Sequence, residues 1–233
     1  MLDAIMLIRG GEKMKKSVYS LVLSDDVVAA VDELAYKMNT SRSNLINQIL
    51  AEHVSFKTPE SIMKDIFNCM RAMMDNHFQI QGQASDAMLS IRSPLRYKYK
   101  PTIRYRVELK KEIDNDVFGF LSVSFRTQST QLLAMLEGFF KLWYKLENYY
   151  IGKYFSEGVE YVYSDGKFIR KLKFSKNIDK SQPESVGRAI GEYVRLIDTQ
   201  LKLYFAGTDE PELTAGKMER LLLDRLNSGM AVI

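Results

Sequence analysis

An isolated β-strand pattern near the N-terminus, followed by two helical patterns, is the feature that most constrains how this chain folds. The strand pattern has two alternating faces, formed by Tyr19, Leu21 and Leu23 and by Val18, Ser20 and Val22. A period of two is typical of a strand with one buried face. A strand without a neighbour leaves its backbone unpaired, and so small a segment cannot build a stable core. We therefore expect it to pair with its copy in a second chain, giving an antiparallel ribbon and an obligate homodimer.

Both helical patterns have capping residues and an apolar stripe. Ser24 can cap the first helix, and Asp25 and Asp26 suit the positive end of its dipole. Asn39 tolerates the left-handed backbone found where helices end, and Ser41 can cap the second helix. The first stripe consists of Val27, Val28, Val31, Leu34, Ala35 and Met38. The second consists of Leu45, Ile46, Ile49, Leu50 and Val54.

Taken together, the strand, both helices and the turn Asn39-Thr40-Ser41-Arg42-Ser43 make the segment from Lys15 to Val54 similar to a known family. It resembles the ribbon-helix-helix (MetJ/Arc/CopG-like) repressors. The resemblance implies a homodimer whose two-stranded ribbon enters the major groove of double-stranded DNA. The chain is then expected to be a bacterial transcriptional regulator.

The resemblance also assigns DNA contacts to individual positions. It places Val18, Ser20 and Val22 against base edges. It places Ser41, Arg42 and Ser43 on a phosphate, because the N-terminus of a helix attracts anions. Lys15 and Lys16, next to the ribbon, can add phosphate contacts.

The base-facing positions depart from the usual family pattern, since two of the three are valine. Valine can contact a thymine methyl group but makes no hydrogen bond to a base, so we expect weak readout that leans towards A·T. An alternative is a non-catalytic interaction protein, of antitoxin or partition type, whose ribbon only dimerises. DNA affinity that falls steeply with added salt would favour the DNA-binding interpretation.

The first residues carry a second pattern. Arg9-Gly10-Gly11-Glu12-Lys13-Met14 back-translates into a purine-rich stretch like a bacterial ribosome-binding site before a start codon. Residues 1–14 are therefore expected to be a disordered arm or a false start upstream of Met14.

Composition favours a folded cytoplasmic protein. Hydrophobic residues make up 46% of the chain and charged residues 27%, which is enough apolar surface for a packed core. The richest apolar run, from Leu132 to Tyr150, is interrupted by four charged residues, so we expect no membrane span. The single cysteine and the lack of a signal-peptide pattern suit a reducing compartment. A net charge of +4 is too small to identify a nucleic-acid binder by itself.

The sequence predicts two units, a module over residues 15–55 and a larger domain over 61–233, with the boundary near Thr58-Pro59-Glu60. In the second unit, helices are expected over 61–78, up to Tyr150, over 183–205 and over 211–226. Residues 79–86 suggest a loop, and Ser164-Asp165-Gly166 a hairpin turn. This order predicts an α+β fold with antiparallel strands. We expect this domain to serve in assembly, in sensing a small-molecule effector or in binding a protein partner.

Residues 88–111 contain eight lysines and arginines against one acidic residue, Glu108. Arg96, Lys98 and Lys100 are expected on one face of an extended segment, opposite two tyrosines. After Pro101, a strand from Ile103 to Leu109 presents Arg104 and Arg106 outward. Two interpretations stay open for these five cations. They could form a second nucleic-acid contact, or they could protect a sheet edge from aggregation.

No arrangement typical of catalysis stands out. His53, His77 and Cys69 are not spaced like metal ligands, and the acidic turn from Glu112 to Asp116 is more typical of turn chemistry than of a metal site. Glycine loops for phosphate and nucleophile motifs are absent from the sequence. We therefore expect neither a metal, nor a cofactor, nor an enzymatic activity.

Overall fold

A computed structural model describes residues 17–82, 85–98, 100–164, 166–176 and 178–233. Within these ranges the chain forms six α-helices and one six-stranded antiparallel sheet, which confirms a mixed α and β fold with antiparallel strands. The arm at 1–14, together with Lys15 and Lys16, lies outside the described residues. None of the described helices has the length and apolar character needed to cross a membrane.

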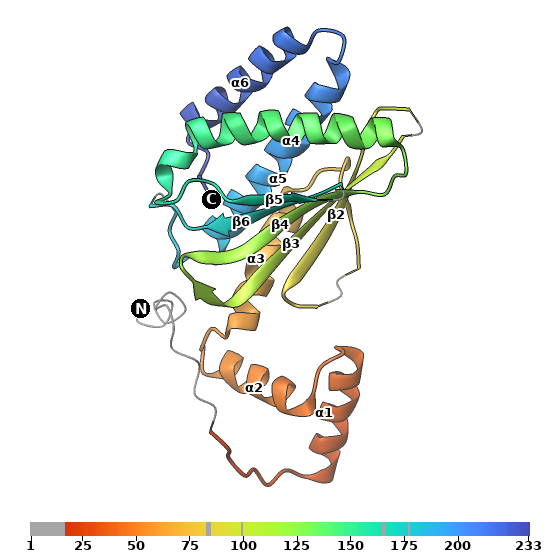
Figure 1. The fold of residues 1–233 in the computed structure, drawn as a ribbon. Coiled ribbons are helices and arrows are strands. Elements are labelled where there is room, and N and C mark those ends of the chain that lie inside the picture. The colour runs from red at the N-terminus through yellow and green to blue at the C-terminus, as the bar shows by residue number, and fades with distance from the viewer. Residues whose placement is uncertain (1–16, 83–84, 99, 165, 177) are drawn as a thin grey trace.

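The N-terminal module contains two helices, α1 (Asp25–Lys37) and α2 (Arg42–His53). Both begin where the sequence predicts. Ser24 is the N-cap residue of α1, although its side chain makes no capping hydrogen bond, and the Ser41 side chain accepts a hydrogen bond of 3.2 Å from the backbone N–H of Asn44. Asn39 has a φ of 51°, the left-handed conformation expected after α1. Figure 1 shows α1 and α2 set apart from the sheet and joined to it through α3.

The sheet has the strand order β1-β2-β3-β4-β6-β5, with every neighbouring pair antiparallel. Its strands are β1 (Gln79–Ile80), β2 (Met88–Pro94), β3 (Thr102–Asp114), β4 (Val117–Phe125), β5 (Tyr161–Ser164) and β6 (Lys167–Lys173). The central pair, β3 and β4, is a long hairpin that turns at Asn115 and Asp116. Both turn residues have positive φ, as the right-handed twist of a tight hairpin favours.

Four further helices complete the fold: α3 (Pro59–Met73), α4 (Thr130–Tyr150), α5 (Pro183–Ala206) and α6 (Pro211–Asn227). The Ser129 side chain caps α4 by accepting a hydrogen bond from the Leu132 N–H. The hairpin of β5 and β6 and the two C-terminal helices are also confirmed.

All the helices that contact the sheet pack on the same face. Tyr105, Val123 and Phe168 form one row of buried side chains across β3, β4 and β6. The Phe140 ring of α4 stacks on Phe168 at 4.4 Å, and Asp198 of α5 accepts a hydrogen bond of 3.0 Å from Tyr105. α3 packs against α5, and α6 also contacts α5. The opposite face of the sheet is therefore left uncovered by these helices.

Three local predictions were wrong. The helix predicted over 61–78 ends at Met73, and the expected loop at 79–86 contains the short edge strand β1. Residues 95–98, 100 and 101 are not extended. The Leu95 N–H donates a hydrogen bond to the Pro101 carbonyl and the Lys100 N–H donates one to the Tyr97 carbonyl, as in a tight loop.

Candidate nucleic-acid interface

Residues 17–24, the described segment before α1, are solvent-exposed and belong to no helix or sheet formed by the described residues. The two alternating faces predicted for it differ in exposure. Val18 and Val22 are fully exposed, whereas on the other face Tyr19 is 83%, Leu21 is 57% and Leu23 is 41% exposed. The face of Tyr19, Leu21 and Leu23, here called the leucine face, is therefore the less exposed one, chiefly at its two leucines.

The helices of the module also leave much of their apolar surface in solvent. Only Ala35 of α1 and Leu45 and Ala51 of α2 are buried among the described residues of these two helices. The large apolar side chains that are exposed include Leu34, Met38, Ile49 and Leu50. Isolated exposed leucines are ordinary, but a stripe on each of two adjacent helices marks an interaction surface.

The predicted phosphate site lies at the start of α2. Ser41, Arg42 and Ser43 are all exposed there, so the free N–H groups of the first turn are accessible to an anion. The Arg42 guanidinium is not free, because it forms a two-pronged ion pair with the Asp32 carboxylate of α1. The hydrogen bond to Asp32 raises the pKa of Arg42. This pair links α1 to α2 at the predicted DNA-contacting end.

The five cations of the basic stretch fall into two groups in the structure. Arg96, Lys98 and Lys100 lie in the loop between β2 and β3 and do not share a strand face. Arg104 and Arg106 lie on β3 and point to the uncovered face of the sheet, as predicted. The loop adopts its shape because Tyr97 turns inward, where its ring contacts Phe205 edge-on at 5.3 Å.

The structure adds two residues to this second group. Arg92 of β2 is the cross-strand partner of Arg104, and Lys167 of β6 lies on the far side of Ser124, which is itself opposite Arg104. Sequence reasoning missed them as members of the site, because which residues share a row depends on the pairing register of four strands. The alternation of apolar and polar residues in 88–94 was the available signal for Arg92.

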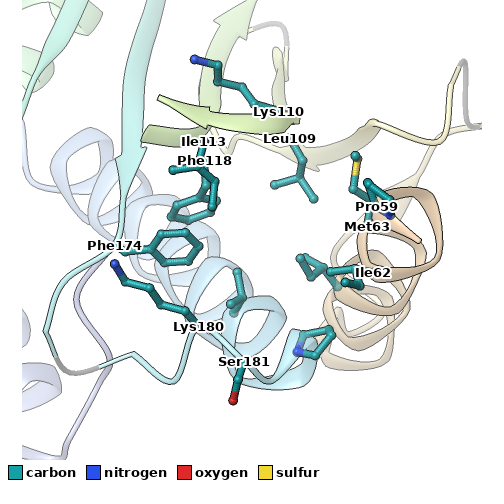
Figure 2. Close-up of a pocket in the computed structure, with 13 residues that line it drawn as sticks. Pro59, Ile62, Met63, Leu109, Lys110, Ile113, Phe118, Phe174, Lys180 and Ser181 are labelled. Carbon is teal, nitrogen blue, oxygen red and sulfur yellow. The ribbon is translucent and has the colours of Figure 1, made fainter. Parts of the chain in front are cut away.

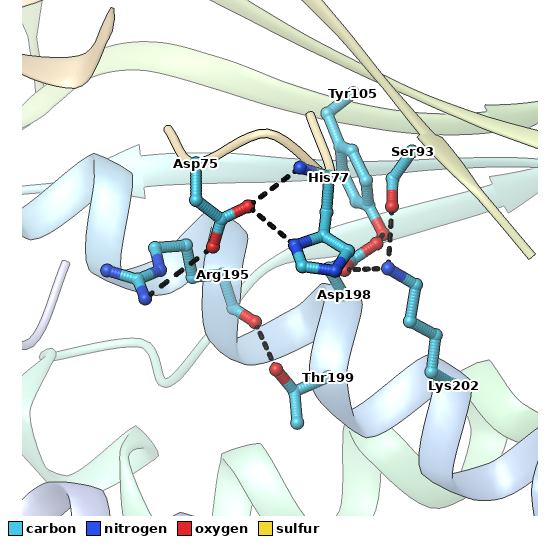
Figure 3. A network of polar contacts seen from close by, with 8 residues as sticks. All are labelled: Asp75, His77, Ser93, Tyr105, Arg195, Asp198, Thr199 and Lys202. Carbon is cyan, nitrogen blue, oxygen red and sulfur yellow. Dashed lines mark hydrogen bonds and ion pairs between the residues drawn. The ribbon is translucent and has the colours of Figure 1, made fainter. Parts of the chain in front are cut away.

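On the covered side of the sheet, a cluster of polar side chains connects α5 to β2 and β3. Figure 3 shows Asp198 between the Tyr105 hydroxyl and the Lys202 ammonium group, which is 2.6 Å from its carboxylate. Lys202 also donates a hydrogen bond of 2.8 Å to Ser93 of β2. Burial raises the pKa of Tyr105 well above its usual value. These groups satisfy one another and tie α5 to β2 and β3.

A small apolar pocket lies between the first turns of α3 and the β3–β4 hairpin. Figure 2 shows Ile62 and Met63 of α3 on one side and Leu109, Phe118 and the Phe174 ring on the other. Lys110 and Lys180 also line it, and each has an aspartate partner, at 3.6 and 3.3 Å respectively. Its lining suits a small apolar group.

The acidic turn at 112–116 does not gather into a metal site. Its Asp114 and Asp116 are the aspartate partners of the two pocket lysines. Within the described part of the chain, no three histidine, cysteine or acidic side chains lie close enough to hold a metal ion.

Comparison of the chain with protein-family models, with curated proteins and with solved structures found no match. The features that bear on function are therefore the exposed apolar surface of the module and the uncovered face of the sheet.

Proposed function

We propose that this chain is a homodimeric ribbon-helix-helix DNA-binding protein that acts as a transcriptional regulator. The observation that supports it most is the exposed segment at 17–24, which has no sheet partner among the described residues. Its leucine face is the less exposed one, and two exposed apolar helices follow it. A second copy can satisfy all three features at once, because two such segments pair as an antiparallel ribbon above interlocked helices.

The ribbon of this dimer presents Val18, Ser20 and Val22 to the major groove. The exposed valines suit contacts with thymine methyl groups, and Ser20 supplies the only hydrogen-bonding side chain of the three. The accessible N–H groups at the start of α2 hold a phosphate and set the register. Arg42 contributes through its pair with Asp32, which orients that end of α2.

Two neighbouring substitutions test the proposal, because adjacent strand residues lie on opposite faces. Leu21→Lys places a charge in the interface between copies, and we expect it to leave the chain monomeric and unable to bind operator DNA. Val22→Lys places the same side chain on the groove-facing side. We expect this variant to remain a dimer and to select a different set of sequences.

Sedimentation equilibrium gives the oligomeric state, and sequencing of the fragments each protein retains from a genomic DNA library gives the sequence preference. A wild-type chain that is monomeric at micromolar concentration would refute the dimer. A dimer that Leu21→Lys abolishes, but that retains no DNA fragments, would instead support the interaction protein that uses its ribbon only to dimerise.

A further inference from the structure

The uncovered face of the sheet carries a row of cations across its central strands. Arg92, Arg104 and Lys167 belong to one row, in which Ser124 of β4 separates Arg104 from Lys167. With strands about 4.8 Å apart, the row spans roughly 14 Å. Arg106, two residues along β3 from Arg104, extends the positive charge along the strand by about 6.6 Å on the same face.

These cations have no counter-charge within the described chain. None of its hydrogen bonds or ion pairs joins Arg92, Arg104, Arg106 or Lys167 to a carboxylate. Arg92 and Arg104 are direct cross-strand partners, an arrangement of like charges that destabilises a sheet. The row is therefore costly to the fold by itself and favourable once an anion lies over it.

Protection of a sheet edge does not explain the cations. Arg104 and Arg106 lie on β3, which has a hydrogen-bonded neighbour on each side, and Arg92 lies on β2, which also has two. The edge strands are β1 and β5. Charges that defend an edge belong on the edge strand, where backbone groups are unpaired.

The side chains around the row suit sugar-phosphate contacts. Ser90, Ser122 and Ser124 lie on the same face between the cations and can donate hydrogen bonds to phosphate oxygens. An acidic residue of this face, Glu108, lies two positions beyond Arg106, opposite Phe120. Lys171 is on this face too, but it is already paired with Glu160.

We propose that this uncovered face is a second DNA-binding surface, which holds the phosphates of duplex DNA without reading its sequence. Arginine, lysine and serine are the side chains that contact duplex backbones. Single-stranded nucleic acid is bound largely by stacking on several aromatic rings. On the described strands of this face, Phe120 supplies the only aromatic side chain, and it lies opposite Glu108 and Lys171 rather than in the row of Arg92, Arg104 and Lys167. The choice of duplex DNA rests on the proposed function, whereas the phosphate contacts do not.

The test compares two triple variants of the full chain that remove the same charge. The face variant is Arg92→Gln, Arg104→Gln, Arg106→Gln. The control variant is Lys64→Gln, Lys145→Gln, Lys217→Gln, at exposed positions on α3, α4 and α6. Each is also made in the Leu21→Lys background, so that the contribution of the ribbon is removed. Circular dichroism melting verifies folding, and relief of the Arg92–Arg104 repulsion should leave the face variant at least as stable as wild type.

The measurement is fluorescence anisotropy of a labelled random-sequence duplex, titrated at several salt concentrations. Each phosphate contact contributes about 0.9 to the slope of log affinity against log salt, so three arginines account for roughly 2.7. We expect the face variant to lose between two and three units of slope, in both backgrounds, and the control variant to lose little. Equal slopes for the two triple variants would overturn the proposal.

Two other outcomes separate this proposal from the first. If Leu21→Lys alone leaves DNA binding unchanged while the face variant still loses slope, the ribbon proposal fails and the face proposal stands. If the Leu21→Lys variant, with its sheet face intact, binds single-stranded DNA more tightly than duplex DNA, the assignment to duplex DNA is overturned.

Discussion

Replacing Arg170 by Met should lower the free energy of unfolding of the C-terminal domain far more than a substitution at the surface does. Arg170 of β6 points into the covered side of the sheet, and its guanidinium lies 2.8 Å from the Glu147 carboxylate of α4. Neither side chain is more than 1% exposed to solvent. The guanidinium also lies 4.4 Å from the centre of the Tyr193 ring and donates a hydrogen bond to the Ile233 carbonyl. Arg170→Met removes this charge and leaves the carboxylate behind.

Breaking a buried pair by removing one partner costs about 3–5 kcal/mol, because an uncompensated charge stays in a region of low dielectric constant. Since both partners are completely buried, we expect the upper half of that range. In a chain of this size each kcal/mol lowers the melting temperature by about 2–4 °C, so Arg170→Met should lower it by roughly 8–20 °C. The double variant Glu147→Leu, Arg170→Met removes both charges and should recover most of the loss.

The pH dependence of the variant follows from Glu147. Burial raises the pKa of this carboxyl even with Arg170 present, and loss of the arginine should raise it further. A carboxyl whose folded pKa lies above its unfolded value binds protons more tightly in the folded state. The loss of unfolding free energy caused by Arg170→Met should therefore be small in acid. It should grow as the pH rises towards the pKa of Glu147 in the folded variant, and level off above that pKa.

Trp143 makes the measurement direct, because it is the only tryptophan and is fully buried near the pair. Its indole N–H donates a hydrogen bond of 3.3 Å to the Tyr193 hydroxyl. Urea unfolding followed by its fluorescence gives the free energy of unfolding for wild type, both single variants and the double variant. A cost below about 1 kcal/mol for Arg170→Met, or a double variant whose cost equals the sum of the singles, would refute the reasoning.

Two further predictions concern stability. Gly187→Ala should destabilise the fold by about 1–3 kcal/mol, because the added Cβ would lie 2.6 Å from the Ile66 carbonyl oxygen of α3, whereas Gly216→Ala, where nothing lies within 4 Å, should not lower the melting temperature. The hydrogen bond from Lys171 lowers the pKa of Glu160, so this carboxylate stabilises the fold above its unfolded pKa and loses that effect as the pH falls through its folded pKa. Glu160→Gln should accordingly cost about 0.5–1 kcal/mol in urea unfolding at pH 7 and nothing in strong acid, and an equal cost at both pH values would contradict this origin.

Capping and turn chemistry made much of the C-terminal domain predictable from sequence. Ser129 is the N-cap residue of α4. The hairpin of β5 and β6 forms where the turn residues indicated it. These signals act through neighbouring residues, so one sequence contains them completely. The loop at 95–101 was not predictable in this way. Its basic and aromatic residues alternate like a strand, but Leu95 is buried and Tyr97 packs on Phe205, about a hundred positions away in the chain.

The candidate surfaces were predictable to different degrees for the same reason. The outward direction of Arg104 and Arg106 follows from alternation along one strand. Their grouping with Arg92 and Lys167 follows from register across four strands, which no local pattern encodes. Arg170 obeys the alternation of β6 but lies on the buried face, where a charge is expected only with a partner such as Glu147.

The net charge of +4 does not show which of the charged groups are paired within the fold and which are free to meet an anion. Many of its acidic groups are already neutralised within the fold, as Asp32 is by Arg42 and Asp198 is by Lys202. Cations that are paired in this way cannot release counterions when DNA binds, whereas the row on the uncovered sheet face can. In the proposed dimer, affinity from that row would add to affinity from the ribbon, because two linked contacts on one duplex act at high effective concentration. The proposed ribbon, with two valines among its three base-facing positions, would then read bases weakly while the row on the sheet face supplied most of the affinity for DNA.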